Sequence, residues 1–302
     1  MIKSIFLLIL LSISISTYSQ TSAIDIKHQL DTLVNRDGFR TWKDTATLNL
    51  VSVYIENEFK KHCDSVSRQE FMVDGRTFSN IIAVVGDTSK PRIVIGAHYD
   101  VCHEQKGADD NGTGVVGLLQ SVQQLKGYSG DYCLEFVAYT LEEPPFYDTQ
   151  YMGSLIHANS LKKSSIEVFG MISLEMIGYF SDDKKSQDYP LGILRLIYGS
   201  RGDYITIVRK LNKGAFARSF SRKYKMRKGV KTKKFTAPKS LPGIDFSDHR
   251  SYWSNGFDAI MLTDTAFYRN KNYHQVTDTL DTIDFKRMAK VIDSLVRTIN
   301  AL

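Results

Sequence analysis

Acidic and imidazole side chains follow successive apolar segments of this sequence, each at the point where a segment ends. In chain order they are His98 with Asp100, Asp110, Glu142 with Glu143, Glu175, and Tyr273 with His274. Imidazole nitrogen and carboxylate oxygen are the zinc ligands of hydrolytic sites that keep a position open for water, and two zinc ions can share one carboxylate. The residue types therefore predict a zinc site, with enough ligands for two ions.

Each of these motifs also has an ordinary structural explanation. An isolated histidine is usually a satisfied structural residue, an Asp-Asp-Asn-Gly stretch is often a turn with a helix cap, and Glu-Glu is commonly a solvated pair. Those explanations do not account for the recurrence of such residues at the ends of successive apolar segments. We therefore treat them as one site, in which the Asp100 carboxylate accepts the second imidazole N–H of His98 and orients the ring.

The hydrophobic periodicity predicts alternating strands and helices. Strands are expected at 68–73, 79–85, 92–97, 132–140, 168–174 and 257–263, and helices at 23–35, 44–61, 115–125, 153–160, 203–212 and 284–299. This alternation is typical of the α/β class, with a mostly parallel central sheet between helical layers. Open parallel sheets bind ligands at the carboxyl ends of their strands, so we expect the acidic and imidazole residues to meet there.

The amino terminus has the pattern of a signal peptide over residues 1–19. Lys3 precedes the apolar run 5–11, and a small-residue stretch at 16–19 follows. The run is much shorter than the roughly 20 apolar residues of a membrane span, so no stable membrane insertion is expected. The mature chain would comprise a single domain at 20–302, exported to the periplasm or the medium.

A basic segment at 209–239 contains thirteen Lys or Arg and no Asp or Glu. Its interleaved aromatic residues are compatible with an anionic partner. The sequence contains no recognised nucleic-acid-binding module, so we do not expect the protein to bind nucleic acid. We interpret the segment as a solvated basic face or as a lid over the active site. The three cysteines, Cys63, Cys102 and Cys133, cannot all pair within the chain.

In combination, the motifs resemble metallopeptidase family 28, the cocatalytic zinc aminopeptidases, whose relatives include glutamate carboxypeptidase and the single-zinc glutaminyl cyclases. The resemblance runs from 93 to 284 through IVIGAHYDVCHEQKGADDNGTGVVGLL, VAYTLEEPPFYDTQYMGSLIHA, MISLEMIGY, FSDHRSYWSNGFDAIMLTDTAFY and NYHQVTDTLDTID. It implies a three-layer α/β/α sandwich with a mixed, mostly parallel sheet, as in zinc-dependent exopeptidases.

The resemblance also assigns metal ligands. His98 and Glu175 would bind one zinc ion, Glu143 and His274 the other, and Asp110 would bridge the two. Glu175 stands where the family usually has an aspartate and is one methylene longer. Two zinc ions per chain are expected, with one ion as the alternative.

The remaining roles concern the reaction on a peptide substrate. Glu142 resembles the general base that takes a proton from the attacking water, and Tyr273 the donor to the developing oxyanion. The expected activity is that of an aminopeptidase. The alternatives are a cyclase forming pyroglutamate and, last, a non-catalytic binding protein. The preferred first residue, the oligomeric state and the role of Asp248-His249 stay open.

Overall fold

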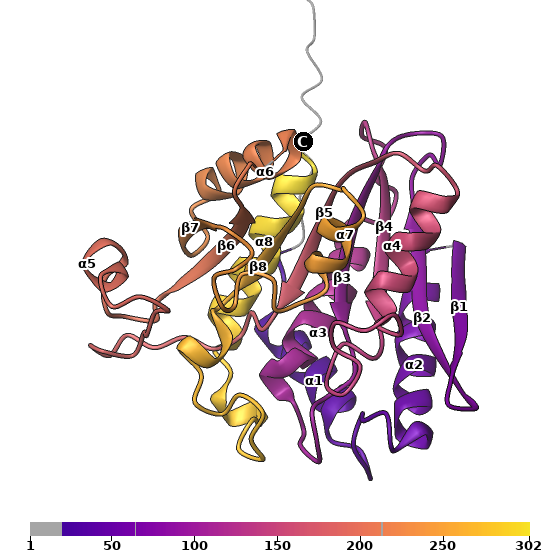
Figure 1. The fold of residues 1–302 in the computed structure, drawn as a ribbon, viewed down its shortest axis with the longest axis horizontal. Helices are drawn as coiled ribbons and strands as arrows, with labels where there is room; N and C mark the ends of the chain where they lie inside the picture. Colours follow the sequence, from indigo (N-terminus) through magenta and orange to yellow (C-terminus); the bar gives the residue numbers. More distant parts are fainter. Residues whose placement is uncertain (1–19, 64, 213) are drawn as a thin grey trace, which may run out of the picture.

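A mixed sheet of eight strands forms the centre of the protein, in the order β1-β2-β4-β3-β5-β8-β6-β7. The computed structural model describes residues 20–63, 65–212 and 214–302 (Figure 1). The strands are β1 (Ser65–Val73), β2 (Arg76–Val85), β3 (Arg92–His98), β4 (Cys133–Tyr139), β5 (Val168–Glu175), β6 (Tyr204–Lys210), β7 (Lys231–Ala237) and β8 (Ala259–Thr263).

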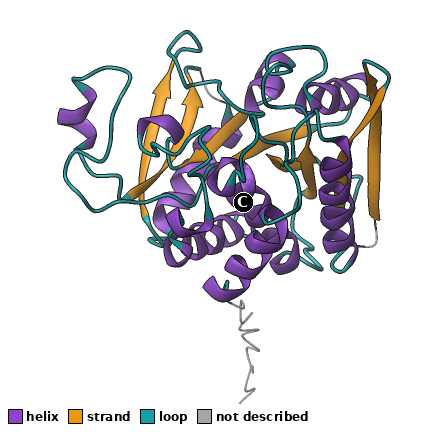
Figure 2. Cartoon of the chain, turned by 90° about the horizontal axis from the view of Figure 1, so that it is seen from below, coloured by secondary structure: helices purple, strands orange, loops and turns teal. Residues whose placement is uncertain are grey.

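Helices cover both faces of this sheet (Figure 2). They are α1 (Ala23–Val34), α2 (Thr45–Lys60), α3 (Gly114–Gln124), α4 (Gly153–Lys163), α5 (Leu194–Tyr198), α6 (Ala215–Met226), α7 (His249–Ser254) and α8 (Phe285–Ile299). One hydrophobic core joins the sheet to α1, α2, α3, α6 and α8, and a second, smaller one joins it to α4 and α7. The predicted three-layer α/β/α sandwich in one domain is confirmed.

The four central strands, β4, β3, β5 and β8, are mutually parallel. β3 and β4 are buried along almost their whole length, as expected for strands with helices on both faces. Their carboxyl ends therefore lie at one edge of the sheet. β6 is antiparallel to β8 and parallel to β7, so these two strands begin at the edge where the central strands end.

The prediction of a helix at 203–212 is wrong, because this segment forms strand β6. The run Tyr204-Ile205-Thr206-Ile207-Val208 is rich in β-branched residues, which favour strands.

The basic segment divides into the end of β6, helix α6 and strand β7. Phe216, Phe220 and Tyr224 recur at a spacing of four along α6 and are buried, while the basic side chains of Arg218 and Arg222 lie on exposed positions. Since α6 packs into the larger core, on the face away from α7, this helix is a solvated basic face and not a lid, whereas Lys233 and Phe235 on β7 line the pocket that contains Glu175.

The proposed signal peptide at 1–19 lies outside the described residues. Within the part of the chain that the structure does describe, no helix is both long enough and apolar enough to span a bilayer.

Asp284 caps helix α8, as the sequence predicted for Thr282 or Asp284. Its carboxylate accepts a hydrogen bond from the backbone N–H of Arg287 at 2.9 Å. We expect Asp284→Ala to lower the free energy of unfolding by about 1 kcal/mol, because an amide at the helix terminus loses its partner. Urea unfolding at a fixed zinc concentration measures this.

The matched control is Asp281→Ala, which removes an exposed carboxylate that caps no α-helix. Equal destabilisation by both substitutions would contradict the capping role of Asp284.

Candidate metal centre

The residues singled out from the sequence converge at the carboxyl edge of the central strands. His98 ends β3, Asp110 lies in the turn Ala108–Thr113 before α3, Glu142 and Glu143 follow β4, Glu175 ends β5, and His274 lies in the loop after β8. All of these side chains except that of His274 are at least nine-tenths buried. The His274 side chain is 23% exposed. The strand-end pattern therefore marks one buried site.

Sharp turns direct these carboxylates. Leu141, just before Glu142, has φ 58°, and Met176, just after Glu175, has φ 49°. Bulky side chains rarely adopt this left-handed conformation, and such residues cluster at functional sites. The chain thus changes direction at the ends of β4 and β5, next to the residues of the site.

The two imidazoles face two separate groups of carboxylates. His98 Nε2 lies 3.4 Å from Glu175 Oε2 and 3.6 Å from Asp110 Oδ1. His274 Nε2 lies 3.2 Å from both Asp110 Oδ2 and Glu143 Oε2. Asp110 therefore presents one carboxylate oxygen to each group, which is the arrangement of a bridging ligand.

Glu142 stands beside both groups. Its Oε2 lies 3.8 Å from His98 Nε2. Burial raises the pKa of Glu142 well above its usual range; His98 opposes this effect, and the carboxylates of Glu143 and Glu175 add to it. A carboxylate with a raised pKa is suited to accepting and returning a proton near neutral pH.

Asp100 orients the site in a different manner from the one expected. His98 Nδ1 lies 3.2 Å from the backbone carbonyl of Asp100, and the nearer carboxylate oxygen is 3.6 Å away. The carboxylate instead accepts hydrogen bonds from the backbone N–H groups of Glu142 and Glu143, at 3.2 and 3.0 Å. Asp100 thus positions both the imidazole and the glutamate pair.

Tyr273 and the Asp248-His249 pair also lie at or near the centre. The Tyr273 ring stacks on His274, with ring centroids 3.8 Å apart. Asp248 is fully buried, and burial raises its pKa to about 7. His249 Nε2 lies 2.7 Å from the backbone carbonyl of Ile244, and burial lowers the pKa of His249 to about 3.

Several contributing residues were missed by the sequence analysis. Cys102 forms a compact group with Glu143 and His274, with potential ligand atoms within 4.8 Å of one another. Ser247 donates a hydrogen bond to Glu175 Oε2 at 2.7 Å. The signal for Cys102 was its position four residues after His98, whereas nothing in the sequence pairs Ser247 with Glu175.

Two more acidic residues hold the bridging segment in place. Asp278 accepts hydrogen bonds from the backbone N–H groups of Asp109 and Asp110, at 2.9 and 3.0 Å. Asp109 accepts from Gly178 N and Asn270 Nδ2, at 3.1 and 2.8 Å. The first aspartate of the Asp-Asp pair is therefore structural, and the second faces the imidazoles.

A buried arginine fixes the loops behind the site. The Arg40 guanidinium donates to the backbone carbonyls of Tyr99, Lys106 and Gly107, at 2.8, 2.7 and 2.9 Å. Burial lowers its pKa to about 10, and nearby carboxylates oppose that shift. Arg40 thus joins the segment before α2 to the loop between His98 and Asp110.

The donor set fits zinc. It combines imidazole nitrogen with carboxylate oxygen. Among the described residues, potential ligand atoms lie within 4.8 Å of one another in three overlapping groups, each small enough to surround one ion: His98, Asp110 and Glu175; Cys102, Glu143 and His274; and His98, Glu142 and Glu143. Asp110 Oδ2, Glu143 Oε1 and His274 Nε2 are buried and have no hydrogen-bond partner among the described residues. Buried polar atoms are normally satisfied, so unpaired ligand atoms that converge in this way are suited to a cation.

An apolar pocket opens beside Glu175 and Tyr273. Phe267 and Tyr268 line it, whereas Phe146 and Trp253 are buried in the cores. Tyr147 contacts the pocket residue Phe246 edge to face, with centroids 6.0 Å apart. The metal centre therefore adjoins a space for a side chain.

Comparisons with known proteins identify relatives of this chain. Residues 80–299 match peptidase family M28. The chain is 38% identical over 257 residues to the uncharacterized protein YfbL of Escherichia coli, covering 82% of this chain and 79% of YfbL. It is 26% identical over 234 residues to a probable leucine aminopeptidase of Trichophyton verrucosum, covering 70% of this chain and 54%, or about half, of that relative.

Solved structures share the fold. The LapA aminopeptidase of Legionella pneumophila superimposes with a TM-score of 0.73 at 17% identity, covering 93% of this chain and 72% of LapA. A glutaminyl cyclase of Tannerella forsythia superimposes with a TM-score of 0.69 at 16% identity, covering 94% of this chain and all of the cyclase. At such identities the likeness shows the fold alone. The family match, which extends over most of the chain and includes every residue of the metal centre, shows that this protein belongs to peptidase family M28.

Proposed function

We propose that the protein is a zinc-dependent aminopeptidase with two metal ions. The observation that carries this proposal is the position of Asp110, with one oxygen toward His98 and the other toward His274. His98, Asp110 and Glu175 would hold one ion, and Asp110, Glu143 and His274 the other, with Cys102 beside the second. When bound, zinc polarises the scissile carbonyl and lowers the pKa of the attacking water.

The side chains of the protein then move the protons. The Glu142 carboxylate takes a proton from the water that attacks the scissile carbonyl and passes it to the leaving amine. The backbone N–H of Glu142 is held by Asp100, which keeps this carboxylate beside His98. Tyr273 would donate a hydrogen bond to the oxyanion that develops on the carbonyl.

The second candidate is a cyclase that converts amino-terminal glutamine to pyroglutamate. The fold is compatible with it, because a glutaminyl cyclase of Tannerella forsythia shares the fold over 94% of this chain. The complete second group of potential ligands favours the peptidase, because the single-zinc reaction does not need it. Peptides that begin with glutamine separate the two, since a peptidase releases glutamine and a cyclase releases ammonia.

We also propose that residues 1–19 are removed during export. Amino-terminal sequencing of the mature protein should then start near Gln20 or Thr21, and the protein should be found in the periplasm or the medium. An intact Met1 on protein purified from its native host would contradict this.

Glu142→Gln should abolish the release of amino-terminal residues while zinc stays bound. The amide retains the shape of the side chain but accepts no proton, and Glu142 is assigned to neither ion. Release from chromogenic aminoacyl substrates and elemental analysis of the same sample measure both properties. Loss of zinc together with activity would show that Glu142 is a ligand.

The shared role of Asp110 predicts a difference between two further variants. Wild-type protein should bind about two zinc ions, and His274→Ala should lose one of them. Asp110→Asn should weaken both, because each oxygen of Asp110 faces a different group. Titration with a chelator, followed by elemental analysis, measures how much zinc each variant retains. Loss of the same single ion in both variants would contradict a bridging role for Asp110.

A further inference from the structure

The pocket beside Glu175 has a floor built from a row of residues across four strands. Glu175 on β5 pairs with Thr263 on β8, Thr263 with Thr206 on β6, and Thr206 with Lys233 on β7. All four line the pocket. Adjacent strands lie about 4.8 Å apart, so the backbone positions of Glu175 and Lys233 are separated by ~14 Å across the sheet.

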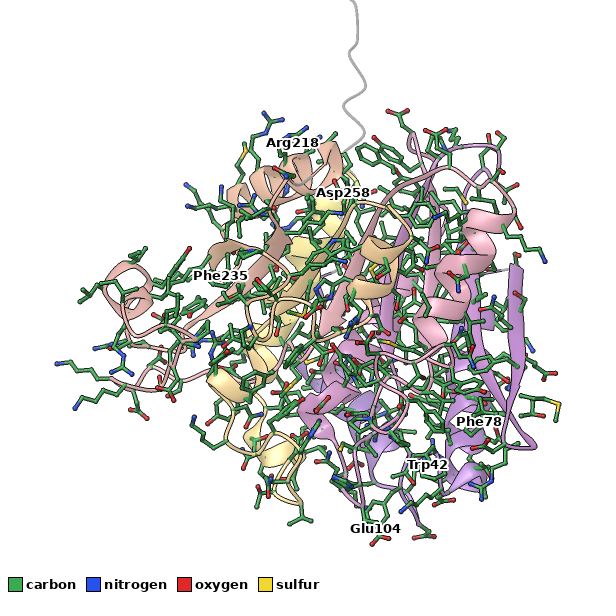
Figure 3. The ribbon with its side chains drawn as sticks, in the orientation of Figure 1. Trp42, Phe78, Glu104, Arg218, Phe235 and Asp258 are labelled. Atoms are coloured by element: carbon green, nitrogen blue, oxygen red, sulfur yellow. The ribbon has the colours of Figure 1, made fainter. Side chains whose placement is uncertain are left out.

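The remainder of the pocket is apolar. A second row of paired residues, Met261, Val208 and Phe235, lies beside the first. Phe235 lies on the side of the sheet nearest to helix α5 (Figure 3). The walls consist mainly of aromatic side chains, including Tyr189, Tyr198, Tyr204, Phe246, Phe267 and Tyr268. Such walls suit the hydrocarbon part of a side chain and strengthen the electrostatic effect of any charge at the far end.

Lys233 supplies that charge. Its ammonium nitrogen lies 3.4 Å from the centroid of the Tyr204 ring and donates to the backbone carbonyl of Tyr198. Among the described residues it forms no ion pair, whereas Lys231, two positions earlier, pairs with Asp203 at 2.7 Å. Burial lowers the pKa of Lys233 to about 8. An ammonium group has three N–H donors, so at least one remains for a ligand besides those facing the Tyr198 carbonyl and the Tyr204 ring.

The charges near Lys233 are mainly positive or already paired. The Asp203 carboxylate, which does not line the pocket, raises the pKa of Lys233 and is paired with Lys231. Arg269 lies on the same Tyr204 ring, with its guanidinium carbon 4.6 Å from the centroid, and adds positive charge. Apart from Glu175, the described lining residues include one carboxylate, Asp188. Asp188 is engaged by Lys271 and Arg195, at 2.9 and 3.2 Å.

Thr206 lies in the row between the metal centre and Lys233. Its residue exposure is 4%, and its hydroxyl oxygen has no hydrogen-bond partner among the described residues. Buried hydroxyl groups are normally bonded, so this one is suited to a polar group of a ligand. The pocket thus offers a hydroxyl without a hydrogen-bond partner and an ammonium without a carboxylate partner among the described residues, in line with the metal centre.

We propose that this pocket selects peptides whose first residue has an acidic side chain, whose carboxylate Lys233 and Thr206 bind. The inference rests on the proposed aminopeptidase function. The α-amine and scissile bond would lie at the metal centre, and the methylene groups would lie against the aromatic walls. An apolar first residue would cover Lys233 and Thr206 without satisfying either, which is unfavourable.

The test compares kcat/KM for chromogenic substrates that begin with Glu, Gln, Leu or Met. We expect wild-type protein to prefer Glu. Lys233→Met should lower kcat/KM for Glu by about ten- to a hundredfold, the usual effect of losing a hydrogen bond to a charged group, without lowering that for Met. Lys231→Met is the matched control, because Lys231 belongs to the same strand but does not line the pocket.

Binding is measured separately, by calorimetry on zinc-loaded Glu142→Gln protein with the dipeptides Glu-Ala and Gln-Ala. Tighter binding of Glu-Ala, lost on adding Lys233→Met but kept with Lys231→Met, supports the inference. Thr206→Val should also weaken binding of Glu-Ala, because valine has nearly the same shape as threonine but lacks the hydroxyl group.

The outcomes separate the two proposals. Release of Leu but not Glu, or equal effects of Lys233→Met and Lys231→Met, would overturn the inference and leave the aminopeptidase function standing. If zinc-loaded wild-type protein cleaves no substrate, the proposed function is overturned. The pocket is then tested by calorimetry alone. Equal affinities for Glu-Ala and Gln-Ala would overturn the inference as well.

Discussion

Four buried carboxylates share the carboxyl edge of the sheet with two imidazoles, and their mutual repulsion is the constraint on which the surrounding structure depends. Burial raises the pKa of Glu143 to about 7 and also raises that of Glu175. Such a cluster is stable only where positive charge and N–H donors surround it. Bound zinc would supply positive charge here, where Asp110 Oδ2, Glu143 Oε1 and His274 Nε2 converge without hydrogen-bond partners among the described residues.

The protein supplies the rest of the compensation from its backbone and from one buried cation. Asp100 and Asp278 bind backbone N–H groups of the segments that carry Glu142, Glu143 and Asp110, so these segments are fixed before any ligand binds. Arg40 crosses behind them and binds three carbonyls. This second layer of contacts holds the carboxylates close together in spite of their repulsion, as preorganised sites require.

The sequence was sufficient for the fold class and for the histidines and carboxylates that converge at the centre, because both depend on local patterns, but it did not identify Cys102 or Ser247. Apolar runs that end in ligands identify the parallel strands and the edge at which they meet. Contacts between distant segments were not predictable: nothing local indicates that Asp278 would hold Asp110, or that Thr206 would pair with Thr263. The strand at 204–210 was missed because its β-branched residues stand beside charged ones, which obscured the alternation.

The antiparallel direction of β6 and β7 has a consequence for how substrate preference can change. The pocket floor consists of strand residues near the start of β6 and β7, rather than of loops. Backbone hydrogen bonds fix the spacing between strands. The distance from the reaction centre to each residue of the pocket floor is therefore also fixed, and it increases by one strand spacing from each strand to the next. A single substitution at one step can alter which side chain is accepted, while the metal ligands, which belong to other strands, keep their geometry.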